Sequence, residues 1–470
     1  MRLINIIGKF IILLQFLMSA WLVFSLWSGG MIPMRFLAVI AGIAFVMVMA
    51  TLAMQYAESV GTNLLGMILS VLFMAVAAKG ATIFMSANSM LANVGGATYK
   101  IDNMVVVVRK DDPAGSLIDA KDYIFGRQTS ADQENTEKML NEIRSRVGQE
   151  ISVLQYDTVQ SEAAALLGGE IEAAVYNEAF TGVLEEAIES YSEQVRVLDH
   201  FEIRTEVGTA GRGVNEPFNV YISGIDVSGP ITTTSRSDVN IIMNVNPDTK
   251  KILLTTTPRD YYVTIPEVSG DQRDKLTHAG IYGVDRSMAA LENLYGVDLS
   301  YYAKVNFTSL IKIVDALGGV DVESDYAFSA GGYSFSQGTN HLDGDAALAF
   351  SRERYSFSDG DNQRGKNQEA VLAAIIKKAS SPTVLASANQ ILRNISKSVE
   401  TNMTQDEMAQ LINMQLSGGG DWDVESQAAS GKGDTQTCFS SGSLPLYVMW
   451  PDEAVVAELS EKMRLVLEEK

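Results

Sequence analysis

The chain has very little cysteine and histidine, and it lacks an excess of positive charge. Cys438 is the single cysteine among 470 residues, and there are three histidines. One cysteine excludes an intramolecular disulfide framework and any cysteine-rich zinc site. The net charge of −21 argues against a general nucleic-acid-binding protein, because such proteins present a basic surface to the phosphate backbone. We therefore expect no nucleic-acid partner.

The acidic residues are unevenly distributed along the chain. Residues 1–97 carry four basic side chains and one acidic side chain, a net charge of +3. Because the whole chain carries −21, the other 373 residues carry −24. The length corresponds to about three structural units at roughly 150 residues each. The charge distribution indicates that the first 97 residues and the remainder face different solvents.

Three apolar segments occupy most of the first 86 residues: 10–27, 37–54 and 64–85. The first two contain no charged residue, and the third contains only Lys79. At about 1.5 Å per residue they reach roughly 27–33 Å, which is enough to cross a hydrocarbon core of about 30 Å. Buried core helices, the alternative, rarely lack charge over such a length. We predict a three-helix membrane anchor over residues 1–97.

The basic residues near the first apolar segment suggest how the chain is oriented. Arg2 and Lys9 precede that segment and favour a cytoplasmic N-terminus, although Arg35 follows it on the opposite side. Three spans would place everything after residue 97 on the other side of the membrane. The sequence thus predicts a multi-pass cell-membrane protein with extracellular C-terminal domains, an environment compatible with a single cysteine.

Residues 98–212 alternate between short β-branched segments and helical patterns. We expect strands over 104–108, 151–155, 171–176 and 195–203, with helices over 131–146, 159–167 and 178–191. This alternation is typical of a small α/β domain. The segment contains no phosphate-binding loop, no His/Cys cluster and no nucleophile elbow. We interpret it as an accessory domain, with a small-ligand site as the alternative.

Residues 213–470 form a second α/β pattern. The expected strands 218–222, 239–245 and 251–256 are each followed or preceded by polar residues, as at the ligand-binding edge of an α/β sheet. Predicted helices cover 287–294, 307–317, 344–350, 363–378, 405–416 and 452–469. The last two are separated by a Gly/Ser-rich region, 417–443, which we expect to be flexible. We predict a catalytic α/β domain over 213–470 with its core at about 217–380.

Two carboxylates and several arginines recur in compact motifs of this second pattern. Asp226 and Asp238 lie at expected strand edges, and paired carboxylates suit a hard cation such as Mg²⁺. The arginines supply planar forks for phosphate oxygens: Arg236, Arg259, Arg352, Arg354 and Arg364. Each signal alone is weak, because aspartates near turns often act as caps and arginine pairs often lie on solvated faces.

The spacing of these residues indicates which of their side chains can face the same way. Arg352 and Arg354 are two residues apart and would face the same way in an extended segment. Arg364 and Gln368 are four residues apart, so they lie on one face of a helix near its N-terminus, where anions are favoured. Arginines gathered with two acids and a metal would suit a diphosphate and phosphoryl transfer.

The ordered motifs closely resemble the LytR–CpsA–Psr family of cell-wall phosphotransferases over about residues 217–380. The resemblance is carried by Asp226, Arg236-Ser237-Asp238, Thr257-Pro258-Arg259-Asp260, Asp315-Ala316-Leu317-Gly318-Gly319, Ser351-Arg352-Glu353-Arg354, and Arg364 with Gln368. The preceding α/β segment and the three-span anchor resemble the capsule-assembly branch. The resemblance implies an α/β fold with a central mixed sheet flanked by helices.

The resemblance also implies an activity. Family members move a glycopolymer, such as capsular polysaccharide or teichoic acid, from a polyprenyl-diphosphate carrier to peptidoglycan. Asp226 and Asp238 would bind Mg²⁺ (or Mn²⁺), with Arg259 as a third catalytic residue. The diphosphate would be held by Arg236, Arg259, Arg352, Arg354, Arg364 and Gln368. Implied partners are the lipid-linked glycan, peptidoglycan, membrane lipid and capsule-assembly proteins.

One position departs from the family pattern, and three other functions compete with this interpretation. Many relatives carry Arg-Gln where this chain has Asn367-Gln368, with Lys366 as a possible substitute. A membrane-anchored transcription regulator would need a basic cytoplasmic segment, and the expected cytoplasmic part is a few residues and one loop. A non-enzymatic receptor for lipid diphosphates or wall glycans and a pyrophosphatase acting on the same carrier remain as alternatives.

Overall fold

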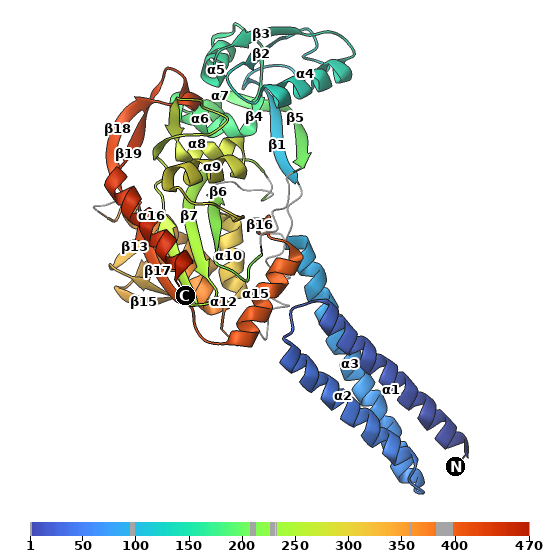
Figure 1. Cartoon of the computed structure of the whole chain (residues 1–470). Helices are drawn as coiled ribbons and strands as arrows, with labels where there is room; N and C mark the ends of the chain where they lie inside the picture. Colours follow the sequence, from blue (N-terminus) through green and yellow to red (C-terminus); the bar gives the residue numbers. More distant parts are fainter. Residues whose placement is uncertain are drawn as a thin grey trace.

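The computed structural model describes residues 2–94, 99–206, 213–225, 231, 233–357, 360–381 and 398–469. A long helical bundle extends from one end of a larger mixed α/β region, and a smaller α/β unit lies at that region's other end (Figure 1). The fold is therefore α/β with an N-terminal helical anchor, as the sequence predicts.

The anchor consists of α1 (Arg2–Ser28), α2 (Met34–Gln55) and α3 (Val60–Val94). Among the described residues, these three helices are long and apolar enough to cross a membrane. The helices also hold buried polar groups: the Thr51 hydroxyl of α2 donates to Gln15 Oε1 of α1 across 2.9 Å. Such interhelical hydrogen bonds help hold helices together in a bilayer. The sequence prediction of a three-helix anchor agrees with this arrangement.

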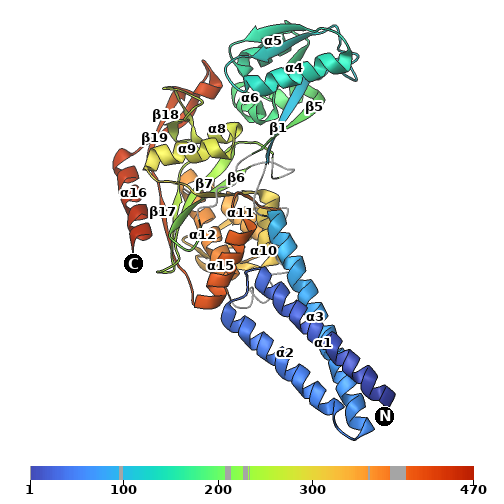
Figure 2. The same cartoon turned by 45° about the vertical axis from the view of Figure 1, so that its right-hand side comes forward.

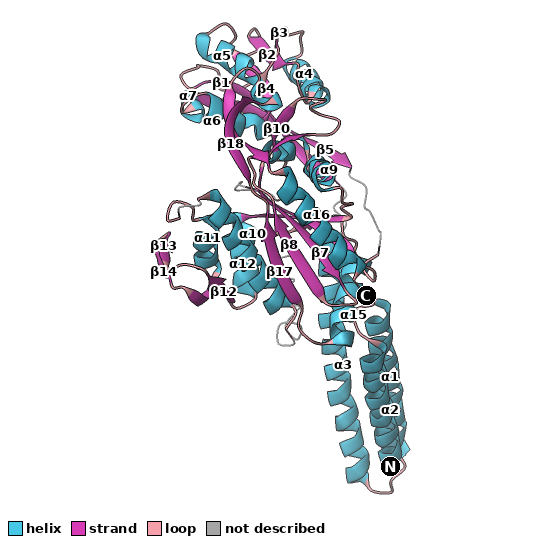
Figure 3. Cartoon of the chain, turned by 60° about the vertical axis from the view of Figure 1, so that its left-hand side comes forward, coloured by secondary structure: helices cyan, strands magenta, loops and turns pink. Residues whose placement is uncertain are grey.

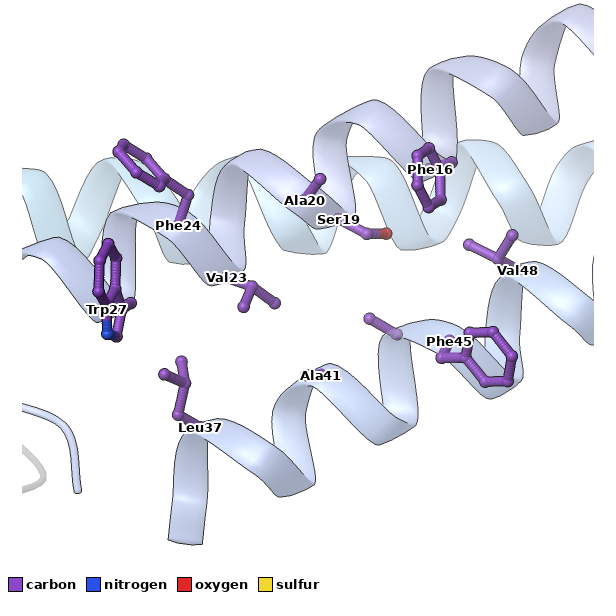
Figure 4. Close-up of a pocket in the computed structure, with 11 residues that line it drawn as sticks. Phe16, Ser19, Ala20, Val23, Phe24, Trp27, Leu37, Ala41, Phe45 and Val48 are labelled. Atoms are coloured by element: carbon purple, nitrogen blue, oxygen red, sulfur yellow. The ribbon is translucent and has the colours of Figure 1, made fainter. Parts of the chain in front are cut away.

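An apolar groove runs between α1 and α2, with a volume of about 570 Å³. Figure 4 shows Phe16, Val23 and Trp27 of α1 facing Leu37 and Phe45 of α2 across it. Its walls are almost wholly hydrocarbon, so in a membrane it suits lipid chains.

The accessory unit is built on a sheet with strand order β3–β2–β4–β1–β5. Its elements are β1 (Tyr99–Arg109), β2 (Ile124–Gln128), α4 (Gln133–Val147), β3 (Ser152–Tyr156), α5 (Val159–Gly168), β4 (Ala173–Asn177), α6 (Thr181–Ala187), α7 (Tyr191–Gln194) and β5 (Val195–Glu206). Strand β2 was not expected from the sequence, because Gly126 interrupts its apolar pattern. A Cβ at Gly126 would lie 2.4 Å from Ile171 Cδ1, so glycine is required for packing there.

The expectation of one continuous helix over 178–191 is also wrong. The chain instead forms a 3₁₀ turn (Glu178–Phe180), α6 and α7. Ile188 is extended and Ser190 has φ +53°, so the helix cannot continue between α6 and α7. The break leaves α6 as a short separate helix.

The main sheet has the strand order β16–β11–β6–β7–β8–β17 within the described residues. Strand β11 is parallel to β6 and β17 is parallel to β8, whereas β7 is antiparallel to both of its neighbours. The strands are β6 (Phe218–Ile225), β7 (Ser237–Asn246), β8 (Lys251–Thr256), β11 (Tyr301–Asn306), β16 (Glu400–Thr401) and β17 (Asp423–Ala428). The sheet is mixed, as predicted.

Successive residues of each strand point to opposite faces, and each face has its own core. Tyr221 and Ile242 pack with α9 (Val284–Tyr295) and α16 (Glu453–Glu468). Val220 and Ile241 pack with α12 (Asp361–Ala379) and α15 (Gln405–Gly418) on the other face. Figure 3 shows α16 and α12 on opposite sides of these strands. The sheet therefore forms the middle of three layers.

Smaller elements flank the main sheet. They are β9 (Tyr262–Thr264), β10 (Arg273–Lys275), α8 (Leu276–Ala279), α10 (Phe307–Ala316), β12 (Val320–Ser324), β13 (Phe328–Ala330), β14 (Tyr333–Phe335), β15 (Gly338–Leu342), α11 (Gly344–Arg352), β18 (Gly431–Thr437) and β19 (Pro445–Pro451). Helices α10, α11 and α12 share one apolar core with residues of β12 and β14.

The expectation of a flexible region over 417–443 is wrong. Part of it forms β17, which joins the main sheet beside β8, and another part forms β18, which pairs with β19. Strands β17 and β18 are polar, and β18 also contains two glycines, so they lack the hydrophobic alternation that identifies strands from sequence. Backbone pairing with neighbouring strands, rather than side-chain burial, holds them in place.

Helix α15 joins the main sheet region to the anchor, and Figure 2 shows it beside the upper end of α3. Arg35 donates to the Leu416 carbonyl across 2.8 Å, and Gln405 donates to Asn88 Oδ1 across 2.7 Å. Ala409 is buried in one cluster with Leu26, Leu37 and Leu91 of the anchor. The main sheet region is thus held close to the end of the helical bundle at which α1 and α3 finish.

Candidate functional site

A polar cleft opens where β8 ends and α12 begins. Its charged and amide-bearing side chains are Asp238 and Asn240 of β7, Arg259 from the segment after β8, and Arg364 and Gln368 of α12. Residues far apart in the sequence therefore meet at one edge of the sheet, where α/β folds commonly bind ligands. Arg364 and Gln368, four residues apart, both face this cleft from α12.

Asp238 and Arg259 form the central ion pair of the cleft. Arg259 Nη1 donates to Asp238 Oδ1 across 3.1 Å, and the Thr277 hydroxyl donates to the same oxygen across 3.1 Å. The side chain of Asp238 is 13% exposed and that of Arg259 is 23% exposed. The backbone N–H of Thr277 also donates to the Arg259 carbonyl, so α8 helps to fix the arginine. Both groups are oriented while still reachable from the cleft.

The ion pair continues away from the cleft as a chain of charges. Arg259 Nε lies 3.7 Å from Asp260 Oδ2, and Asp260 Oδ1 lies 3.4 Å from Lys275 Nζ. Lys275 in turn lies 3.1 Å from Glu186 Oε2 on α6 of the accessory unit. Although burial alone would raise it, the charges of Lys275, His278 and Arg236 lower the pKa of the Glu186 carboxyl. The accessory unit thus supplies a carboxylate to the charge network of the cleft.

Helix α12 approaches β8 very closely beneath the cleft. A Cβ at Gly365 would lie 3.0 Å from Thr256 Cγ2, and Glu369 Oε1 accepts a hydrogen bond from the Thr256 N–H across 3.0 Å. Burial raises the pKa of Glu369 to about 8. Glu369 therefore ties the end of β8, which leads to Arg259, to the helix that carries Gln368.

The position that departs from the family pattern does not face the cleft. Asn367 is buried; its Nδ2 donates to the Phe350 carbonyl at the end of α11, and its Oδ1 accepts from Gln363. Lys366 is exposed. Asn367 therefore has a structural role between α12 and α11.

An apolar cavity of about 250 Å³ adjoins the polar cleft. It lies between the sheet and helices α10 and α12, and its apolar lining includes Val305, Leu310 and Ile375. Gln368 lines both the cavity and the cleft, so the two spaces meet at its side chain. The arrangement places a group of charged side chains directly beside a space lined mainly by hydrocarbon.

Arg352 stands at the cavity rather than in the polar cleft. It is the last residue of α11, not part of an extended segment, and its guanidinium lies 4.3 Å from the centre of the Phe307 ring. Arg354 follows the helix and stacks on Tyr355 at 4.7 Å. The expectation that an extended segment aligns these two arginines is therefore wrong, because the helix ends between them.

The remaining predicted site residues lie elsewhere. Arg236 binds Glu186 of the accessory unit across 2.6 Å and is not among the residues lining the cleft. Asp226 lies outside the described residues, so the structure does not place it. The structure thus brings together Asp238, Arg259, Arg364 and Gln368, with Arg352 beside the adjoining cavity.

The cleft contains an oxygen donor of the type that Mg²⁺ prefers. Asp238 offers a carboxylate, and Mg²⁺ is commonly held by one or two carboxylates together with substrate phosphates. Within the described residues there is no group of three or more His, Cys, Asp or Glu side chains placed to hold a metal without a substrate. The described part supplies Asp238 as the one carboxylate lining the cleft.

Several residues of the network were missed from the sequence. Thr277 and Lys275 belong to none of the motifs that identify the site in the sequence, and Asp260 lies within Thr257-Pro258-Arg259-Asp260, where Arg259 is the candidate phosphate ligand. The sequence does not identify Glu186 or Glu369 as part of the site, because isolated glutamates in helical patterns resemble ordinary surface residues. Their roles depend on tertiary contacts.

The chain is similar in sequence to proteins of one known family. The model of the LytR_cpsA_psr family matches residues 183–449, more than half of the chain. A curated relative from Bacillus mycoides, named polyisoprenyl-teichoic acid–peptidoglycan teichoic acid transferase TagU, is 40% identical over 203 residues. The match covers 43% of this chain and 66% of that protein. A relative of the same name from Oceanobacillus iheyensis is 33% identical, with 41% of this chain and 61% of that protein covered.

The crystal structure of B. subtilis TagU is 29% identical with a TM-score of 0.42, covering 54% of this chain and 98% of that chain. The matched part of the present chain spans less than two thirds of the length of the curated relatives.

Proposed function

The chain belongs to the LytR_cpsA_psr family, and on that premise we propose that it transfers a glycopolymer from a polyprenyl-diphosphate carrier to peptidoglycan. The observation that carries the proposal is the junction at Gln368, where the cationic cleft meets the apolar cavity. A polyprenyl diphosphate has this same division between a charged headgroup and a hydrocarbon tail. The names of the curated relatives, which specify teichoic acid as the polymer, support the same chemistry.

In this proposal the diphosphate lies at the mouth of the polar cleft, which has a volume of only about 20 Å³, and the cavity holds the first part of the tail. Arg259 and Arg364 bind phosphate oxygens with their guanidinium forks, and Gln368 donates from its amide at the boundary. Arg352 neutralises charge at the cavity entrance, and Arg236 and Arg354 approach from outside the cleft. At about 250 Å³ the cavity accommodates only a short part of a long polyprenyl chain. The rest of the chain then stays in the bilayer.

The reaction is a displacement at phosphorus. A peptidoglycan hydroxyl oxygen forms a bond to the glycan-bearing phosphorus, and the bond from that phosphorus to the bridging oxygen breaks. The products are a phosphodiester-linked polymer and polyprenyl monophosphate. Asp238 accepts the hydroxyl proton, while Arg259 stabilises negative charge on the transferred phosphate.

We further propose that Asp238, together with Asp226, holds Mg²⁺ or Mn²⁺ when substrate is bound. The ion would supply additional neutralisation of phosphate charge. Transfer by the purified chain should then be lost in excess chelator and restored by adding Mg²⁺. Equal transfer with and without chelator would contradict this role.

The same proposal orients the chain across the membrane. Arg2 and Lys9 favour a cytoplasmic N-terminus, which puts the cleft on the outer side. Because α15 is bound to the outer end of the anchor, the cleft would stay near lipid-linked substrate in the same membrane.

The direct test uses the full chain in lipid vesicles with a radiolabelled polyprenyl-diphosphate-linked glycan and peptidoglycan. Label should become covalently attached to peptidoglycan with the wild type and not with Asp238→Asn. A wild type that binds the donor but never attaches label would instead be a receptor.

A further inference from the structure

Glu186 on α6 binds two cations at once. Its Oε1 accepts from Arg236 Nη1 across 2.6 Å, and its Oε2 lies 3.1 Å from Lys275 Nζ. The side chain of Lys275 is 7% exposed, whereas those of Glu186 and Arg236 are 28% and 23% exposed. Lys275 is thus the fixed partner, and Arg236 is the partner with more freedom to leave.

A glycine on the same helix makes room for the Arg236 guanidinium. A Cβ at Gly182 would lie 2.7 Å from Arg236 Cζ and 2.8 Å from its Nε. Glycine is a poorer helix former than alanine, so a glycine at the second residue of α6 is readily explained by a packing requirement. Here the reason is the guanidinium, which lies directly against the helix backbone.

The bound arginine is close in sequence to the site. Arg236 precedes Asp238 by two residues, and Lys275 connects Glu186 through Asp260 to Arg259. Arg236 is therefore a cation two residues from the carboxylate that lines the cleft, and its guanidinium is paired with a carboxylate of the accessory unit.

We propose that Glu186 competes with the substrate diphosphate for Arg236, so that the accessory unit restrains the affinity of the site. This inference rests on the proposed function, because it takes a diphosphate as the ligand. When a diphosphate enters the cleft, Arg236 exchanges the Glu186 carboxylate for phosphate oxygens. Lys275 keeps Glu186 in place, so the carboxylate is available again after product leaves.

The competition makes the free energy of diphosphate binding less favourable. A guanidinium that is already paired must give up its hydrogen bond to Glu186 before it can bind phosphate, so part of the binding free energy is lost. Removing the carboxylate, or pushing the guanidinium off Gly182, removes this cost. A residue that merely positioned Arg236 for phosphate would have the opposite effect on affinity.

Binding of inorganic pyrophosphate to the detergent-solubilised full chain, measured by isothermal titration calorimetry, tests the proposal. Glu186→Gln and Gly182→Ala should each tighten binding about fivefold or more. Gly182→Ala changes no charge, so its gain would not come from the general electrostatic field. Arg236→Gln should weaken binding more in the Glu186→Gln background than in the wild type.

Two control variants separate this effect from general changes. Glu189→Gln removes a negative charge from an exposed residue three positions away, and Gly168→Ala adds a methyl group in α5 where no atom lies within 4 Å. Both should leave pyrophosphate affinity close to the wild-type value. Thermal unfolding of each variant confirms that the chain is folded.

The outcomes distinguish this inference from the function on which it rests. If the wild type binds pyrophosphate but Glu186→Gln and Gly182→Ala bind it equally or more weakly, the competition is refuted and the proposed function stands. If Glu186→Gln and Gly182→Ala bind pyrophosphate and the wild type does not, the competition by Glu186 is supported. If neither the wild type nor the variants bind, both proposals fail.

Discussion

Arg259 donates a hydrogen bond to Asp238 across 3.1 Å, joining the segment after β8 to the start of β7 at the edge of the main sheet. Thr277 donates to the same carboxylate oxygen. Both ionic side chains are largely buried, and removing one charge of such a pair leaves the other poorly compensated. We therefore expect transfer activity to fall when either side chain is removed and also when Arg259 is replaced by another cationic side chain.

Replacing Arg259 with lysine should lower kcat of glycan transfer by about 100-fold or more. Lysine keeps the charge but loses the planar fork that can bind Asp238 and phosphate together, and losing one preoriented donor commonly costs 10²–10³-fold. The matched control is Arg464→Lys on α16, where the arginine pairs with Glu461 and Glu468 at the surface. Comparable activity of the two variants would contradict the assignment of Arg259.

Filling the apolar cavity should affect only substrates with a long tail. Ala303 on β11 lines the cavity, and Ala303→Phe should raise KM for a polyprenyl-diphosphate donor about tenfold. Affinity for inorganic pyrophosphate should stay at the wild-type value, because the polar cleft is unchanged. An equal loss of affinity for both ligands would show that the cavity does not hold the tail.

Glu369→Gln should stabilise the chain increasingly as pH rises. Burial raises the pKa of Glu369 to about 8, above the unfolded value of about 4.3. Between these values the folded chain retains a proton that the unfolded chain has released, so this group lowers stability as pH increases. Glutamine does not titrate and can still accept from the Thr256 N–H.

Differential scanning fluorimetry at pH 5 and pH 8 measures this effect. The Tm of Glu369→Gln should be close to wild type at pH 5 and higher by a few degrees at pH 8. A Tm difference that is constant between the two pH values would show that Glu369 does not titrate in this range.

Ala409→Glu should loosen the site region from the anchor. Ala409 is 3% exposed within an apolar cluster shared with α1, α2 and α3, where a carboxylate would be buried without a partner. Hydrogen exchange in α15 should increase, and transfer from vesicle-borne donor should fall while pyrophosphate binding persists. Gln410→Glu, at an exposed position of the same helix, is the control and should show neither change.

The hydrophobic pattern predicted the elements that depend on burial. The anchor helices have continuous apolar sequences, and β8 (Lys251–Thr256) has the bounds predicted from its run of β-branched and aliphatic residues. Strands β2 and β17 could not be predicted in the same way. Gly126 interrupts β2, and β17 is a polar edge strand held by backbone pairing to β8.

The site was predicted only where motifs identified its residues. Asp238, Arg259, Arg364 and Gln368 were expected, and the structure gathers them at one cleft. The contact of Arg236 with Glu186 could not be foreseen, because it joins residues 50 positions apart through packing of the accessory unit. Likewise, the structural role of Asn367 depends on the nearby end of α11.

The measurement that most directly tests the proposed function is a product analysis of the vesicle reaction by mass spectrometry. The proposed transfer yields equal amounts of polyprenyl monophosphate and of peptidoglycan joined to glycan through a phosphodiester, and Asp238→Asn should form neither product. Release of polyprenyl monophosphate with free phosphorylated glycan and unmodified peptidoglycan would contradict it and identify the chain as a pyrophosphatase.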